Sequence, residues 1–228
     1  MRRACVLVLL LAVGASSLAL ARHPHQPARD AAKTSASREA PATGFDYYVM
    51  ALSWSPSYCR SHPDDDEQCA RRGFGFVLHG LWPQYETGNG PQRCASSAEV
   101  DRRTAEAALA FMPSRRLINH EWRAHGTCSG LTPAAYFASA DRAFASVQAP
   151  PQLKAPTRDL TMTAEQLRAA LRGANPALTD AMFKLNCSRG ELVEVRVCLD
   201  KDLAPRDCGK RLRNACPAQA AFTIPASR

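Results

Sequence analysis

The segment FDYYVMALSW, residues 45–54, decides the fold that we predict for this chain of 228 residues. It is aromatic and apolar and partly alternates with polar side chains, which is the pattern of a β-strand. The following SPSY, residues 55–58, is expected to end the strand. A second, mostly apolar strand is expected over residues 74–81. We expect Pro83 to halt it, because proline donates no backbone hydrogen bond to a sheet.

Helix signals fill the middle of the chain. Ser114 and Thr163 are suitable N-caps, and Gln166 completes a capping-box pattern with Thr163. Pro113 ends the first Ala-rich stretch, and Thr132-Pro133 opens a later one. Four helices are therefore expected, over residues 98–112, 114–125, 132–148 and 163–173.

Two further strands are expected near the C-terminus, over residues 181–187 and 191–199, around a Ser-Arg-Gly turn. Strands and helices are therefore segregated along the chain rather than strictly alternating. This order predicts an α+β fold, with a central antiparallel sheet flanked by helices.

The first residues carry the features of an export signal. Arg2 and Arg3 precede an apolar run that ends at Ala19-Leu20-Ala21, which is typical of a signal peptide over residues 1–21. The alternative is a membrane anchor, but the run is barely long enough to span a bilayer. Residues 22–44 are rich in Ala, Pro and Arg and predict a disordered spacer. A single folded domain is then expected over residues 45–228, with no membrane association after signal removal.

Cysteine number and charge agree with export and with a polyanionic partner. Nine cysteines less Cys5 leave an even number, which favours four disulfides in an oxidising compartment, periplasmic or extracellular. Zinc binding is the alternative, but the paired C-x-x-C arrangement is missing. The formal charge is +8, or +6 without Arg2 and Arg3, and suits RNA, DNA, anionic lipid or an acidic glycan.

Three histidines fall in two dense segments, which are HGLWP at residues 79–83 and HEWRAHGTC at residues 120–128. Metal-independent RNA cleavage needs a base for the ribose 2′-hydroxyl and an acid for the leaving 5′-oxygen. Histidine suits both roles because its pKa lies near neutrality. The alternative is a set of buried structural histidines beside tryptophans. Three histidines concentrated in two such segments favour a catalytic role over a structural one.

The second segment nearly matches the zinc-protease motif H-E-x-x-H. That motif needs histidines four residues apart on one helical face, whereas His120 and His125 are five apart, or about 140° around a helix. Glu121 and His125 are instead the pair four apart. This spacing favours acid–base chemistry over metal binding, so we expect no metal and no cofactor.

The two segments resemble the active-site signatures of the ribonuclease T2 family, H-G-L-W-P and H-E-W-x-K-H-G-T-C. The resemblance continues through residues 52–59 and 195–202 and so covers most of residues 45–217. It implies a metal-independent endoribonuclease that cleaves single-stranded RNA through a 2′,3′-cyclic phosphate to 3′-phosphate ends. DNA, which lacks the 2′-hydroxyl, is expected to resist.

The resemblance also assigns roles. His125 is implied to be the general base, His79 the general acid and His120 a phosphate-binding residue, while Glu121 organises the transition state. The disulfides that it implies are Cys59–Cys69, Cys94–Cys128, Cys187–Cys216 and Cys198–Cys208.

One position departs from the family pattern, because the lysine before the last signature histidine is Ala124 here. That lysine is understood to stabilise charge on the phosphorane. Arg123 is adjacent but points about 100° away on a regular helix. Either Arg123 or another basic group compensates, or turnover is reduced by about tenfold to a thousandfold.

Base preference is expected to be weak. Trp82 and Tyr85 are candidates for stacking on bases of any kind, although Trp82 is equally well explained as core. Gln84 offers a neutral amide to several bases. We expect a monomer. The main alternative function is an RNA-binding or cytotoxic protein on the same fold that has weakened catalysis.

Overall fold

The computed structural model describes residues 44–227, with the exception of residues 71, 88, 97 and 98. The signal peptide and all of the spacer but Gly44 lie outside the described residues, so both remain predictions. Within the described residues, no helix combines the length and the apolar character that crossing a membrane requires.

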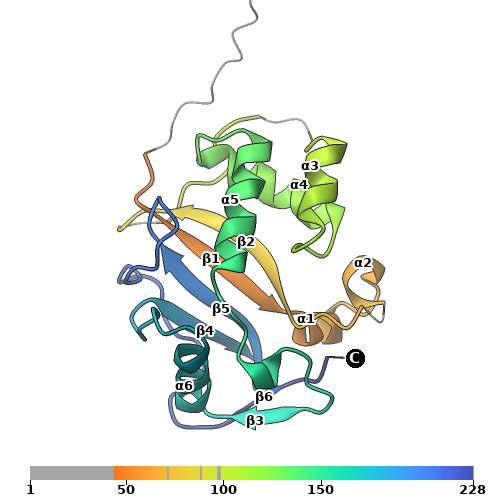
Figure 1. Cartoon of the computed structure of the whole chain (residues 1–228), viewed down its shortest axis with the longest axis vertical. Helices are drawn as coiled ribbons and strands as arrows, with labels where there is room; N and C mark the ends of the chain where they lie inside the picture. The colour runs from red at the N-terminus through yellow and green to blue at the C-terminus, as the bar shows by residue number, and fades with distance from the viewer. Residues whose placement is uncertain (1–43, 71, 88, 97–98, 228) are drawn as a thin grey trace, which may run out of the picture. The chain divides into compact units, whose positions relative to one another are not determined.

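A six-stranded sheet forms the centre of the described part (Figure 1). Its order is β2-β1-β5-β6-β3, and β4 also pairs with β5. The pairs are antiparallel except β5 with β6, so the sheet is mixed and the α+β prediction is confirmed. The strands are β1 Tyr47–Trp54, β2 Phe76–Gln84, β3 Leu160–Met162, β4 Phe183–Ser188, β5 Glu191–Leu199 and β6 Phe222–Ile224.

The sequence did not reveal β3 and β6, each of three residues, because so short a strand shows no period. They pair with each other and join the sheet where Glu191 lies beside Thr223. The helices are α1 Ser55–Ser61, α2 Asp66–Cys69, α3 Arg102–Ala108, α4 Arg115–Ala124, α5 Pro133–Ala145 and α6 Ala164–Ala174, with 3₁₀ turns at Gly126–Cys128 and Pro151–Leu153.

One of the two predictions about proline-containing segments was confirmed and the other was wrong. SPSY ends β1 at Trp54 as expected, and Ser55–Ser61 then forms α1 with Pro56 in its first turn, where the missing N–H costs nothing. Pro83 does not halt β2, which continues to Gln84 with Pro83 opposite Tyr48. Since β2 is an edge strand, it has one unpaired side on which a proline is tolerated.

The helix caps were predicted correctly, but the first and third of the four predicted helices are shorter than expected. Ser114 accepts a hydrogen bond from the backbone of Leu117, and Thr163 with Gln166 forms the expected capping box. The first Ala-rich helix shrinks to Arg102–Ala108, and α5 ends at Ala145.

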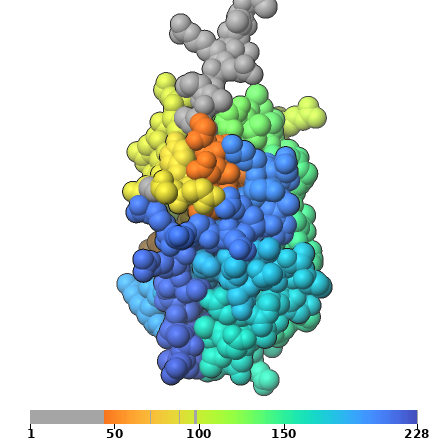
Figure 2. All heavy atoms as spheres, turned by 90° about the vertical axis from the view of Figure 1, so that its left-hand side faces the viewer, coloured from red at the N-terminus to blue at the C-terminus, as the bar shows by residue number. Residues whose placement is uncertain are grey.

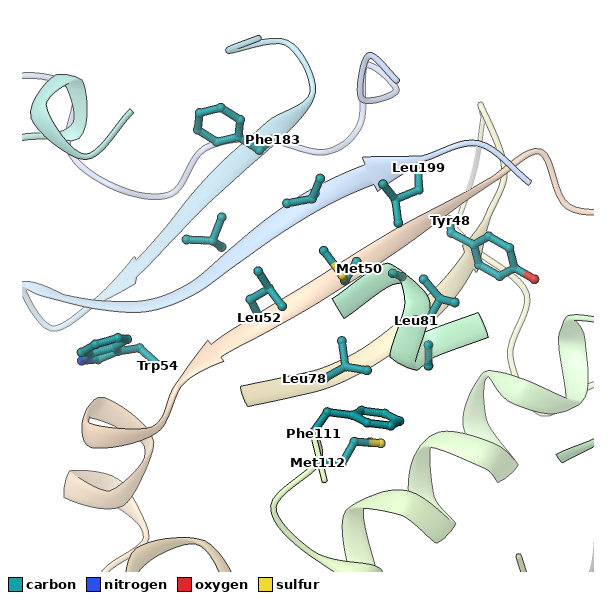
Figure 3. Close-up of a cluster of buried hydrophobic side chains, with 14 of the residues drawn as sticks. Tyr48, Met50, Leu52, Trp54, Leu78, Leu81, Phe111, Met112, Phe183 and Leu199 are labelled. Atoms are coloured by element: carbon teal, nitrogen blue, oxygen red, sulfur yellow. The ribbon is translucent and has the colours of Figure 1, made fainter. Parts of the chain in front are cut away.

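One face of β1 and β2 forms the centre of the core (Figure 3). Met50, Leu52 and Trp54 of β1 and Leu78 and Leu81 of β2 point to the same side and are buried. Helix α5 packs over β1 and β2, and α3 and α4 lie beside the β2 edge (Figure 1). The opposite face of β1 and β2 carries the polar side chains described below.

The structure forms the four disulfides that the resemblance implied. On the face in Figure 2, the segment after β2 (yellow) lies against the start of β1 (orange) and the C-terminal segment (blue). An ion pair of 2.6 Å between Glu86 and Arg206 joins the first and last of these.

Candidate active site

His79 occupies a β-bulge in β2. Ala51 of β1 pairs with Gly80 and Leu52 pairs with Leu78, which leaves His79 as an extra residue without a partner. The bulge explains why Leu78 and Leu81 are both buried although an odd spacing would put them on opposite faces of a regular strand. His79 thereby lies near Trp82, with the ring centroids 5.1 Å apart and edge to face. Bulges beside active sites commonly redirect a side chain in this way.

Glu121 contacts this strand from helix α4. Its Oε2 accepts a 2.7 Å hydrogen bond from the indole nitrogen of Trp82, and its Oε1 lies 3.6 Å from Nε2 of His79. The carboxylate is 1% exposed. A Cβ at Gly80 would collide with Glu121 and Trp82, so only glycine allows the helix to approach so closely.

The other two histidines lie at the end of α4. His120 is on the helix, is 54% exposed and has its Nε2 4.0 Å from Oε1 of Glu121. His125 is the C-cap residue, and its ring lies 5.3 Å from that of Trp82. Its Nδ1 is buried without a hydrogen-bond partner among the described residues. Trp82 therefore lies beside both His79 and His125.

The surroundings shift the pKa values of His125 and His79 in opposite directions. Burial and the nearby His120 and His79 lower the pKa of His125 to about 4. Burial would also lower the pKa of His79, but the hydrogen bond to Glu194 and the charges of Glu121 and Glu194 outweigh it and raise that pKa. Burial raises the pKa of Glu121 to about 7, although His79 and the Trp82 hydrogen bond oppose it. At neutral pH His125 is a free base and His79 is biased towards its acid form.

Burial and the neighbouring cations act together on His120. Burial, His79 and the arginines Arg93, Arg123 and Arg116 lower its pKa. Its exposed ring sits between two hollows. One, of about 330 Å³, is also lined by His79, Arg116 and Arg123.

The second hollow, of about 420 Å³, lies beside Ala124. Its lining includes His120, Arg123 and Arg93. The backbone N–H of Arg93 donates a 2.9 Å hydrogen bond to the carbonyl of Ala124, and the next residue, Cys94, is bonded to Cys128. Sequence reasoning missed Arg93, since only the disulfide brings its loop to the end of α4.

Glu194 and Arg196 of β5 were also missed. Glu194 accepts a 3.0 Å hydrogen bond from Nδ1 of His79 and one of 2.6 Å from Nε of Arg196. In sequence they are two charges alternating with Val195 and Val197, which looks like an ordinary solvent-facing side of a strand. The signal available was a pair of opposite charges on one face of a predicted central strand.

The predicted base-binding residues are dispersed. Trp82 is held inside the histidine cluster, with Arg196 stacked 5.4 Å from its ring, rather than standing free. Gln84 is half-buried at the end of β2, and Tyr85 packs against the core. Arg123 is exposed and lines both hollows beside His120.

Within the described residues, no group of three His, Cys, Asp or Glu side chains is arranged to hold a metal ion. Metal independence stays a prediction about the reaction.

A disulfide-linked α+β fold and a cluster of three histidines with a buried glutamate define the class of the protein. The Ribonuclease T2 family matches residues 45–208, and the chain belongs to this family. A ribonuclease of Aeromonas hydrophila is 52% identical over 88 residues, 39% of this chain and 40% of that protein. A probable ribonuclease of Haemophilus influenzae is 30% identical over 178 residues, 72% of this chain and 61% of that protein.

The fold is also found among solved structures. The crystal structure of RNase NT in complex with 5′-AMP superposes with a TM-score of 0.63 at 24% identity, covering 80% of this chain and 99% of that one. The chain therefore matches less than two thirds of the length of each of these two curated relatives but nearly all of this solved structure.

Proposed function

We propose that this protein is an endoribonuclease that cleaves single-stranded RNA by metal-independent transphosphorylation. The observation that carries the proposal is the opposed pair of imidazoles around Trp82, His125 with a pKa lowered to about 4 and His79 with a pKa raised. Two titratable groups whose pKa values are shifted in opposite directions are typical of a base and an acid in one site.

In the proposed reaction, His125 takes the proton from the ribose 2′-hydroxyl. The oxygen attacks the phosphorus, and His79 gives its Nε2 proton to the leaving 5′-oxygen, which yields a 2′,3′-cyclic phosphate. Water then opens the cycle to a 3′-phosphate, with the two histidines exchanging roles. In the first step His125 gains a proton and His79 loses one, and the second step returns both imidazoles to their starting states.

His120 and the nearby cations bind the phosphate in this proposal. His120 is exposed between two hollows lined by Arg93, Arg116 and Arg123, which suits a chain of phosphates. Glu121, neutral or charged near its pKa of about 7, lies within reach of both His79 and His120 and organises the transition state. With Trp82 inside the cluster, little is left for base-specific contacts, and we propose weak base preference.

A second candidate is an RNA-binding protein with weakened catalysis, favoured by the buried Ala124 at the position of the family lysine. One experiment separates the two. A defined single-stranded RNA and its DNA counterpart are incubated with the protein in EDTA, and the product ends are analysed. The proposal expects cyclic and 3′-phosphate ends from RNA and no DNA cleavage. Efficient DNA cleavage, 5′-phosphate ends or binding without turnover would contradict it.

A further inference from the structure

The arrangement of β1 lets His79 meet a carboxylate two strands away. Within the sheet, β1 separates β2 from β5. On the polar face, Ala51 of β1 lies opposite Arg196, and Ser53 lies opposite Glu194. Because these two side chains are small, His79 and Glu194 reach each other over β1 and form their 3.0 Å hydrogen bond.

This hydrogen bond determines which ring nitrogen of His79 faces the reaction. Glu194 is 5% exposed. Its burial would raise its pKa, but the hydrogen bond from His79 and the charge of Arg196 outweigh burial and lower it, so the group is an anion. A carboxylate only accepts hydrogen bonds, so Nδ1 of His79 carries the hydrogen. Nε2 is therefore the nitrogen directed at Glu121, 3.6 Å away.

Arg196 completes a closed set of contacts. It donates to Glu194 at 2.6 Å, and its guanidinium lies 5.4 Å from the centre of the Trp82 ring. Trp82 donates to Glu121, which lies beside His79. Both carboxylate oxygens of Glu194 are thus held by hydrogen bonds, one from His79 and one from Arg196.

We propose that Glu194 is a positioning residue for His79: it holds the ring by Nδ1 and so makes Nε2 the atom that delivers the proton to the leaving oxygen. The proposal rests on the function proposed above. Glu194 acts through His79, because it is buried and its two carboxylate oxygens bond to His79 and Arg196. A carboxylate that orients a histidine from behind is a known way to fix its tautomer and to favour its charged form.

The charged and titratable groups around His79 come from several elements, and all bear on its titration. Helix α4 contributes Glu121 and His120, the C-cap His125, and the arginines Arg116 and Arg123; β5 contributes Glu194 and Arg196; Tyr58 and Asp65 line the same hollow. Among them, Glu194 is the one that hydrogen-bonds Nδ1.

The first test follows His79 by NMR titration of its ring protons, in the whole protein without substrate. Loss of a contacting opposite charge should lower the midpoint of His79 by about one pH unit or more in Glu194→Gln. Arg196→Gln should move the midpoint the other way, because Arg196 opposes protonation of His79. Glu191→Gln is the matched control on the same strand, where the side chain pairs with Arg60 instead, and should leave the midpoint unchanged.

The second test is the pH dependence of kcat/KM on a dinucleotide. In Glu194→Gln, the alkaline limb of the profile should move to lower pH by the same amount as the NMR midpoint. In Glu194→Asp, which keeps a carboxylate, the limb should lie closer to its wild-type position. A purely structural role would lower the rate equally at every pH, and that result would overturn the proposal. An unchanged His79 midpoint in Glu194→Gln would also overturn it. If Glu194→Gln does not fold, an unchanged midpoint in Arg196→Gln would do the same.

The two tests also separate this inference from the function on which it rests. If the His79 midpoint shifts as expected but no variant or wild-type protein cleaves RNA, the positioning contact stands and the proposed function fails. If the wild-type protein cleaves RNA but the midpoint does not respond to Glu194, the function stands and the positioning role is wrong.

Discussion

The indole nitrogen of Trp82 donates a 2.7 Å hydrogen bond to Oε2 of Glu121, and this bond joins the edge strand β2 to helix α4. It places a carboxylate that is 1% exposed between two histidines. Because burial raises the pKa of Glu121 to about 7, the group titrates near neutral pH.

Replacement of Glu121 should trade activity for stability. In the folded state its pKa is about 7 against an ordinary 4.5, so the folded protein holds a proton that the unfolded chain loses between those values. The free energy of unfolding therefore falls as pH rises from about 4.5 through 7. Glu121→Gln should be more stable than wild type at pH 8 by about 1–3 kcal/mol, with kcat at least about tenfold lower.

Urea unfolding at pH 5 and 8 measures the difference in stability, with Glu106→Gln, at an exposed position, as control. A destabilised variant at pH 8 would contradict the burial argument.

The histidine variants should differ in kind. His79→Ala and His125→Ala should each lower kcat by at least about a hundredfold, because each removes a proton-transfer partner. His120→Ala should chiefly raise KM, since its exposed ring binds phosphate. His62→Ala serves as the control, because the ring of His62 stacks on Tyr58 and does not line the hollow beside His79. Near-wild-type rates for His79→Ala or His125→Ala on a dinucleotide would show that the roles are misassigned.

The pH profile of kcat/KM should be bell-shaped and broad. His125 must be neutral to act as a base, so activity should fall only as pH drops through about 4. His79 must be protonated to act as an acid, and its raised pKa should hold the alkaline limb above the ordinary histidine value. Rate measurements from pH 3 to 9 at constant ionic strength test both limbs. An acid limb near pH 6.5 would mean that His125 is not the base.

The hollow beside Ala124 should reveal which cation faces the transition state. If Arg93 or Arg123 compensates for the family lysine, Arg93→Ala or Arg123→Ala should lower kcat by about tenfold or more, and Ala124→Lys should change little. If neither compensates, Ala124→Lys should raise kcat by about tenfold. We expect partial compensation. Arg103→Ala, on the surface of α3, is the control. Should none of these variants change kcat, no cation from this hollow acts in the transition state.

Cleavage should weaken steeply with added salt. Residues 22–228 carry a formal charge of +6, and ions screen its attraction for the RNA backbone. The measurement is kcat/KM on an oligonucleotide from 20 to 200 mM salt, with a dinucleotide as the control that has few phosphates. Equal salt dependence for both substrates would rule out electrostatic capture of the chain.

The sequence alone determined the parts that depend on local pattern. The alternation in residues 45–54 predicted β1, and Ser114 and Thr163 predicted two helix starts. The two histidine segments supplied the candidate site residues, which the fold brings close together. These signals survive without tertiary information because caps and strand periods involve residues a few positions apart.

Only the tertiary structure decided how distant segments meet. A bulge turns His79 to the polar face, an edge position admits Pro83, and the small Ala51 and Ser53 let Glu194 reach His79 from two strands away. Likewise the Cys94–Cys128 disulfide brings Arg93 to Ala124. None of these follows from local pattern, because each depends on strand order, on register and on which side chains are small enough to let others pass. The histidines were therefore readable from the chain, whereas the charges that set their pKa values came only from the fold.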